Sequence, residues 1–249
     1  MNRPGASNET NADDAASVII SGSMSTSEIL SRLNRHGCPE ITAQLDLSKF
    51  SRAAVSTGGF GDVYRGALRD GTRVGAKCLR LLIGADDDDG RKQLKRAARE
   101  LYVWSKCKHP NILELVGVAQ YDERVAMVSP WMENGNLTWY LSRHPEADRY
   151  SLCAQVADAT AFLKTYGVVH GDIKGANILV SRDGVPKLAD FGTSAINNYT
   201  LNFTTTTTSP QMTLRWTAPE IFLGETKHTF EGDVQSWYAT LLWVIRFII

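Results

Sequence analysis

The chain has 249 residues, enough to bury an independent hydrophobic core in one large domain or two small ones. Hydrophobic residues make up 43% and charged residues 22% of it, which excludes an intrinsically disordered, collagen-like or coiled-coil chain. The 27 basic and 27 acidic side chains cancel, so no overall charge draws the chain to nucleic acid or to an anionic membrane. Any charged partner must therefore be met by a local cluster of side chains.

The cysteines and the apolar stretches indicate a location in the cytoplasm. Cys38, Cys78, Cys107 and Cys153 lack the spacing of a zinc site or of a disulfide framework, so reduced thiols are expected. The sequence begins without a signal-peptide pattern, and its longest apolar stretch, residues 237–249, is shorter than the ~20 residues that a membrane span requires. We expect no membrane span and predict a core helix at residues 237–249.

Residues 1–42 are predicted to form a mobile tail that contains one short helix. Residues 1–25 are rich in small polar side chains and lack periodic apolar positions. Ser27 is the predicted cap of the helix, which carries three apolar side chains and ends before Gly37.

Residues 43–132 are expected to form a small lobe rich in β-structure. The predicted strands lie at residues 53–55, 63–66, 73–82, 112–118 and 125–128. A helix is predicted over residues 91–106, with Glu100 at the border of its apolar face. That position would direct the carboxylate of Glu100 at whatever the helix packs on.

Residues 133–249 have a different pattern, which predicts a large lobe rich in helices. The clearest helix is predicted over residues 150–166, where apolar side chains recur at helical spacing. A sheet-rich first half followed by a helix-rich second half predicts an α+β fold of two lobes with a cleft between them.

Two segments of the small lobe could contact a phosphate. The sequence STGGFGDV, residues 56–63, is a glycine-rich turn that would let backbone N–H groups approach a phosphate closely, although an ordinary hairpin turn has the same pattern. Lys77 follows on the next predicted strand as a candidate phosphate ligand. A single lysine on a strand is more often just solvated, so neither segment decides the chemistry alone.

A second polar set lies between apolar runs of the large lobe. In VVHGDIKGANILV, residues 168–180, Asp172 precedes Asn177 by five residues, which separates a potential proton acceptor from a potential metal ligand. Asp190 in the DFG triplet adds a second carboxylate next to a flexible glycine. Two carboxylates, an amide and lysines suit magnesium and phosphate chemistry.

The ordered set of a glycine loop, VxxK, a helix glutamate, HxDxKxxN, DFG and APE resembles the protein kinase superfamily. The segments HGDIK and LRWTAPE are most similar to the tyrosine-kinase-like branch, whose members generally phosphorylate Ser and Thr. The resemblance implies the two-lobed protein kinase fold over residues 43–249, with a β-rich small lobe and an α-rich large lobe that ends early in its central helix.

The resemblance implies a nucleotide-binding site for ATP. The glycine loop would cover the phosphates, and Lys77, paired with Glu100, would hold the α- and β-phosphates. Ser129 would be the gatekeeper residue, and Met132 would donate its N–H to the adenine. The implied nucleotide-binding residues are Gly58, Gly59, Phe60, Gly61, Val63, Lys77, Glu100, Met132 and Leu179.

The same resemblance assigns the catalytic and metal-binding roles. Asn177 and Asp190 would hold Mg²⁺. Asp172 would accept or orient the proton of the substrate hydroxyl, and Lys174 would neutralise charge on the transferring phosphoryl group. The implied partner is a protein substrate with Ser or Thr, and Thr217 supports that specificity.

Several positions depart from the pattern of the family. Ser56 and Gly75 replace a usual glycine and alanine of the ATP site, and both changes are mild. Gly171 replaces the arginine that would pair with a phosphorylated activation loop, so we expect activity that does not depend on loop phosphorylation through that residue. Residues 204–209 offer a run of phosphoacceptors or simply a flexible polar insert.

The end of the sequence departs most. Asp233 resembles the start of the central helix of the large lobe, where it would bond the backbone of the catalytic loop. Only a short segment follows, so we expect a C-terminally truncated fragment with an apolar patch exposed where later helices would pack.

Two classes of function remain open on the sequence alone. The first is an ATP- and Mg²⁺-dependent Ser/Thr protein kinase, a signalling enzyme of the cytoplasm. The alternative is a catalytically silent pseudokinase that binds nucleotide or serves as a scaffold and is silenced by the truncation. The APE segment disfavours a small-molecule kinase, and nothing in the sequence predicts an oligomeric state.

Overall fold

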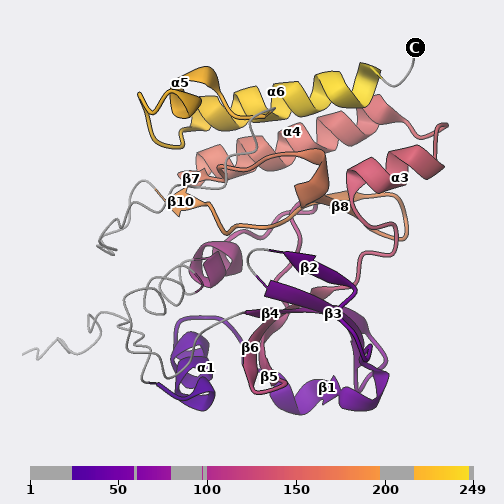
Figure 1. Cartoon of the computed structure of the whole chain (residues 1–249), viewed down its shortest axis with the longest axis vertical. Helices are drawn as coiled ribbons and strands as arrows, with labels where there is room; N and C mark the ends of the chain where they lie inside the picture. The colour runs from indigo at the N-terminus through magenta and orange to yellow at the C-terminus, as the bar shows by residue number, and fades with distance from the viewer. Residues whose placement is uncertain (1–23, 59–60, 80–96, 98–99, 197–215, 247–249) are drawn as a thin grey trace, which may run out of the picture.

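The computed structural model describes residues 24–58, 61–79, 97, 100–196 and 216–246. A curled β-sheet makes up most of one lobe, and the helices α3, α4 and α6 make up most of the other (Figure 1). The predicted two-lobed α+β fold is therefore confirmed. The expected tail of residues 1–23 and the candidate phosphoacceptors at residues 204–209 lie outside the described residues.

The small lobe is built on one antiparallel sheet with the order β1-β3-β4-β6-β5, and β2 also pairs with β3. The strands are β1 (Leu45–Asp46), β2 (Ser56–Gly58), β3 (Gly61–Leu68), β4 (Arg73–Leu79), β5 (Gly117–Tyr121) and β6 (Arg124–Pro130). The register places Lys77 between Val63 on β3 and Met127 on β6. Apolar residues of these strands, Val74, Ala76 and Cys78 among them, are fully buried and form the core of the lobe.

Two predicted strands of this lobe were wrong. Residues 53–55 are not a strand, and β2 begins only at Ser56. Residues 113–116 are also not part of a strand, since Leu113 N–H donates to Leu188 O of the large lobe at 2.9 Å, and pairing with β6 begins at Val116, whose N–H donates to Val128 O. Residues 80–82 of a third predicted strand lie outside the described residues.

The helix α1 (Thr26–Arg35) precedes the sheet. Its N-cap is Ser25, so the predicted cap at Ser27 was wrong. The Ser25 hydroxyl accepts from Glu28 N–H, and the Glu28 carboxylate accepts from Ser25 N–H at 2.8 Å. This capping box satisfies two backbone donors at once, which a cap at Ser27 could not do. Short 3₁₀ turns follow at Thr42–Gln44 and Leu47–Lys49.

The large lobe combines helices with two short antiparallel sheets. Its elements are α3 (Leu137–Arg143), α4 (Arg149–Thr165), β7 (Val168–Val169), η4 (Gly175–Asn177), β8 (Ile178–Val180), β9 (Pro186–Leu188), β10 (Ala195–Ile196), α5 (Pro219–Phe222) and α6 (Phe230–Arg246). The helix α4 matches the helix predicted over residues 150–166 to within one residue at each end. It packs along α6 (Figure 1). The strands pair as β8 with β9 and β7 with β10.

The helix α6 buries only one of its faces. Trp237, Leu241 and Trp243 pack against the core, which agrees with the predicted core helix in the described part of residues 237–249. On another face, Val234, Tyr238 and Leu242 are each 49% exposed, as expected of an uncovered apolar patch. No helix in the described ranges is long and apolar enough to cross a membrane.

Candidate active site

Three charged residues from three separate elements meet between the lobes. Lys77 lies on β4, Glu100 on the helix at residues 100–106, and Asp190 after β9. The Lys77 Nζ lies 2.8 Å from Glu100 Oε1 and 3.2 Å from Asp190 Oδ1. Glu100 is only 3% exposed, whereas Lys77 and Asp190 are 20% and 30% exposed. The cluster therefore has a buried end at Glu100 and a more accessible end at Asp190.

The charges of this cluster hold one another in their ionised forms. Burial lowers the pKa of Lys77, but the carboxylates of Glu100 and Asp190 outweigh that effect and raise it overall. Burial likewise raises the pKa of Asp190, yet the ammonium of Lys77 reverses the direction and lowers it. Asp190 is thus a carboxylate at neutral pH, directed by a left-handed backbone with φ of 68°.

A second cluster lies on the loop between β7 and β8. Asp172 Oδ2 accepts from Lys174 Nζ at 2.7 Å and from Asn177 Nδ2 at 2.8 Å. Asn177 Nδ2 also donates to the main-chain oxygen of Asp172 at 2.8 Å. These bonds draw three of the four polar side chains of the HxDxKxxN pattern, Asp172, Lys174 and Asn177, together. The loop is joined to the first cluster through Ala189 N–H, which donates to Asn177 O at 2.9 Å next to Asp190.

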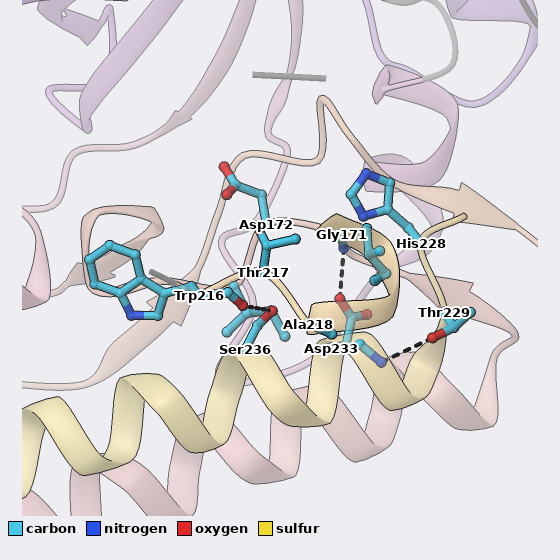
Figure 2. Close-up of a pocket in the computed structure, with 12 residues that line it drawn as sticks. Gly171, Asp172, Trp216, Thr217, Ala218, His228, Thr229, Asp233 and Ser236 are labelled. Atoms are coloured by element: carbon cyan, nitrogen blue, oxygen red, sulfur yellow. Dashed lines mark hydrogen bonds between the residues drawn. The ribbon is translucent and has the colours of Figure 1, made fainter. Parts of the chain in front are cut away.

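A buried carboxylate on α6 fixes the backbone of this loop. Asp233 accepts from His170 N–H at 2.6 Å and from Gly171 N–H at 2.7 Å. Figure 2 shows Asp233 reaching from α6 toward Gly171, with the Asp172 carboxylate directed away from the helix. Burial raises the pKa of Asp233, against the lowering effects of His170 and the two N–H donors. The predicted bond from Asp233 to the catalytic loop is thus present.

A stack of buried rings connects the loop to the helix of Glu100. Phe191 is 1% exposed, and its ring centroid lies 5.1 Å from that of His170 and 6.4 Å from that of Trp104. His170 Nε2 donates to Ala189 O at 3.2 Å, while Nδ1 accepts from Asp172 N–H at 3.3 Å. The two bonds assign the proton to Nε2. Phe191 is the middle residue of the DFG triplet, and Trp104 carried only the signal of an apolar position on the predicted helix, so the sequence assigned a role to neither.

The comparisons with known proteins agree with this arrangement. The profile of the family described as protein tyrosine and serine/threonine kinase matches residues 51–247. The chain belongs to this kinase family. Calmodulin-binding receptor-like cytoplasmic kinase 1 of Arabidopsis thaliana is 30% identical over 199 residues, covering 77% of this chain and 41% of that kinase.

Two further kinases from other organisms are similar to the chain. A probable serine/threonine-protein kinase of Dictyostelium discoideum is 29% identical over 197 residues, covering 77% of this chain and 20% of that protein. Tyrosine-protein kinase Btk of Drosophila melanogaster is 28% identical over 198 residues, covering 77% of this chain and 24% of that protein. The chain spans less than half the length of each of these relatives.

The residues expected to bind nucleotide are placed as follows. Gly58 is exposed at the end of β2. Gly61 begins β3, and an added Cβ there would clash with the main-chain oxygen of Cys78, so only glycine fits. Val63 is the β3 neighbour of Lys77. Met132 and Leu179 are half-buried on the core. Gly59 and Phe60 lie outside the described residues.

The oxygen donors near Asp190 fit a magnesium ion. Mg²⁺ takes oxygen ligands and is usually held by one or two protein side chains together with phosphates and water. Because Asn177 Nδ2 donates to Asp172, the amide oxygen of Asn177 would be its ligand atom. Lys77, Glu100 and Asp190 together carry a net charge of −1, which favours a cation beside Asp190.

One departure from the family has a structural reason that the sequence did not reveal. Gly171 has a φ of 81°, and an added Cβ would lie 3.2 Å from two ring atoms of His228. Any larger residue would be strained there and would displace the imidazole. His228 lies beside Gly171 and lines a small hollow next to Asp172 (Figure 2). Its only sequence signal was a position shortly before Asp233.

Proposed function

We propose that the chain is the catalytic domain of a protein kinase that transfers a phosphoryl group from Mg²⁺-bound ATP to Ser or Thr hydroxyls. The observation that carries the proposal is the meeting of Lys77, Glu100 and Asp190 within 3.2 Å, beside a loop that presents Asp172. An ion cluster with a purely structural role would be expected to balance its charges. This cluster instead leaves a net negative charge beside the partly exposed Asp190. The four cysteines are all free, which supports a reducing, cytoplasmic location.

The side chains have distinct tasks in this reaction. Lys77 binds phosphate oxygens and is held in its charged form by Glu100. Asp190 and the amide oxygen of Asn177 are the residues that would hold Mg²⁺, which supplies charge neutralisation at the phosphates when bound. These residues bind and orient the nucleotide.

The catalytic loop acts on the substrate hydroxyl. Asp172 orients that hydroxyl and accepts its proton, while Lys174, 2.7 Å from Asp172, offsets negative charge on the transferring group. Asn177 holds Asp172 in place through its side-chain amide. The contribution of the protein is therefore mainly positioning and electrostatic stabilisation.

Specificity for Ser and Thr is the finer part of the proposal. It is supported by Lys174 on the catalytic loop and by Thr217, which lines the hollow next to Asp172 (Figure 2). The similar proteins named above include both a serine/threonine and a tyrosine kinase. Phosphoamino-acid analysis of the product decides this point.

The test is phosphate transfer by the purified 249-residue chain with Mg²⁺ and labelled ATP, alone and with a generic protein substrate. We expect incorporation on Ser or Thr that is lost in both Asp172→Asn and Lys77→Met. Nucleotide binding without transfer would instead favour the pseudokinase alternative, and incorporation on tyrosine would overturn the Ser/Thr specificity. Ser31→Ala, at an exposed position on α1, is the matched control for handling of the variants.

A further inference from the structure

The segment at residues 25–41, called here the N-terminal segment, packs between the sheet and the helix of Glu100. Its helix α1 lies beside β5 and β6 (Figure 1). Thr26 Oγ1 donates to Glu123 O at 3.0 Å in the turn between those strands. The buried side chains Ile29, Leu30 and Leu33 belong to the same hydrophobic cluster as Leu101 and Trp104 of the helix. The N-terminal segment is therefore part of the core and not an appendage.

The end of α1 turns the chain back toward the helix of Glu100. Cys38 N–H donates to Leu33 O at 3.1 Å and Gly37 N–H to Asn34 O at 3.2 Å, and Gly37 has a φ of 90°. This is a Schellman motif, which reverses the chain and packs its last residue on the helix. The reversal brings Cys38 Sγ to 3.8 Å from Leu101 O, the residue directly after Glu100. Burial raises the pKa of the Cys38 thiol, so the thiol is protonated and can donate.

The next residues close the edge of the sheet. Val118 N–H donates to Pro39 O at 2.8 Å, and Ile41 N–H donates to Val118 O at 2.9 Å. The approach depends on Gly117, because an added Cβ there would lie 2.5 Å from Pro39 O. Because the atom in the way is a main-chain oxygen, no side chain could move aside to make room for that Cβ. The end of the N-terminal segment is thus tied to the helix through Cys38 and to β5 through Pro39 and Ile41.

We infer that the N-terminal segment positions Glu100 for its contact with Lys77. Lys77 is fixed to the sheet by the pairing of β4 with β3 and β6. Glu100 belongs to a separate helix, and the segment contacts that helix one residue away through Cys38. By joining sheet edge and helix, it sets the distance of 2.8 Å between Lys77 and Glu100. Its catalytic consequence rests on the proposed kinase function, but its structural content does not.

The test loosens the segment without touching the charged residues. Leu33→Ala empties part of its core contact, and Gly117→Ala pushes Pro39 away while leaving α1 intact. Ser31→Ala, exposed on the same helix, is the control, and Leu33→Met should restore the packing. Hydrogen exchange is followed by mass spectrometry in residues 100–106 and, as an internal reference, in α4.

The expected result is faster exchange in residues 100–106, by about tenfold, in Leu33→Ala and Gly117→Ala, with α4 unchanged. Leu33→Met and Ser31→Ala should exchange like the parent chain. Unchanged exchange in residues 100–106 would overturn the inference. Equal acceleration in α4 in both variants would also overturn it, since the segment would then stabilise the whole chain and not this helix.

Phosphate transfer is the second readout. A displacement of Glu100 by about 1 Å lowers the turnover number by about 10- to 100-fold, and Leu33→Met should recover it. A variant with faster exchange in residues 100–106 but full turnover would overturn the link between the segment and Glu100. If the parent chain transfers no phosphate, the proposed function fails, whereas the exchange measurement still decides whether the segment holds the helix.

Discussion

The two lobes hold their charged residues by different means. In the small lobe, Lys77 is fixed on a strand, but its contact with Glu100 joins only two side chains from separate elements. In the large lobe, the backbone of the loop before Asp172 donates two N–H groups to Asp233 on α6. A contact between side chains depends on where two elements lie, whereas backbone hydrogen bonds fix the loop itself. The small-lobe pair is therefore the adjustable half of the site, and the catalytic loop is its fixed half.

The largest effect is expected at the fixed half. Asp172→Asn removes the carboxylate that we propose accepts the hydroxyl proton, and we expect the rate of phosphate transfer to fall by about 10²- to 10⁴-fold. The melting temperature should change little, because the asparagine oxygen can still accept a hydrogen bond from Lys174 or Asn177. A rate within about threefold of the parent chain would show that Asp172 has no such role.

The hydrogen bonds that fix the loop are the second target. Asp233→Ala leaves the N–H groups of His170 and Gly171 without their acceptor, and each should cost about 1–3 kcal/mol of the free energy of unfolding. Urea unfolding measures this loss. Gln235→Ala, an exposed neighbour on α6, is the control. Equal stability of the two variants would mean that the loop does not depend on Asp233.

The adjustable half is best measured by a double-mutant cycle. Lys77→Met, Glu100→Gln and the double variant should show a coupling of about 0.5–3 kcal/mol in the free energy of unfolding, because Glu100 is buried and its partner lies at 2.8 Å. The more exposed pair Arg73 and Glu133, whose side chains are 51% and 25% exposed, is the comparison, with an expected coupling below about 1 kcal/mol. Equal coupling in both pairs would remove the distinction between the Lys77 pair and a surface salt bridge.

The smallest effect concerns pH at His228. Burial lowers its pKa below the ordinary 6.5, although the carboxylates of Asp233 and Asp172 oppose this shift. As pH falls, the unfolded chain therefore takes up the proton on His228 before the folded chain does. The contribution of neutral His228 to the free energy of unfolding is complete above pH 6.5 and is lost as pH falls through the lower pKa of the folded chain. Between about pH 7.5 and about pH 5.5, the parent chain should lose more in melting temperature than His228→Phe. His36→Phe, at an exposed position, should follow the parent chain.

The parts of the fold that the sequence predicts are those with local or ordered signals. The helix α4 follows from apolar spacing alone, and the kinase fold follows from short motifs in a set order. The capping box of α1 is visible in the sequence as Ser25 and Glu28, but Ser27 also precedes the apolar positions of the helix. Two serines two positions apart therefore make the boundary ambiguous.

Long-range contacts explain the other differences. Residues 112–116 have β-like side chains, yet Leu113 N–H donates to Leu188 O on β9 of the other lobe, which no local pattern could indicate. The packing of His228 on Gly171 and of Cys38 on Leu101 joins residues 57 and 63 positions apart in the chain. The charged side chains of the site and Asp233 were found through the motifs and the family resemblance, whereas Cys38, Trp104 and His228 carry no motif.

The pairing of residues 111–113 with β9 attaches this loop to the large lobe. Leu113 N–H donates to Leu188 O, and Leu188 N–H donates to Asn111 O, so the loop moves with the large lobe. Trp104 donates its indole N–H to Leu113 O and so connects the end of the Glu100 helix to that loop. Glu100 lies one turn away, about 6 Å along the helix axis. A rotation of the helix by about 10° about Trp104 would therefore displace Glu100 by about 1 Å.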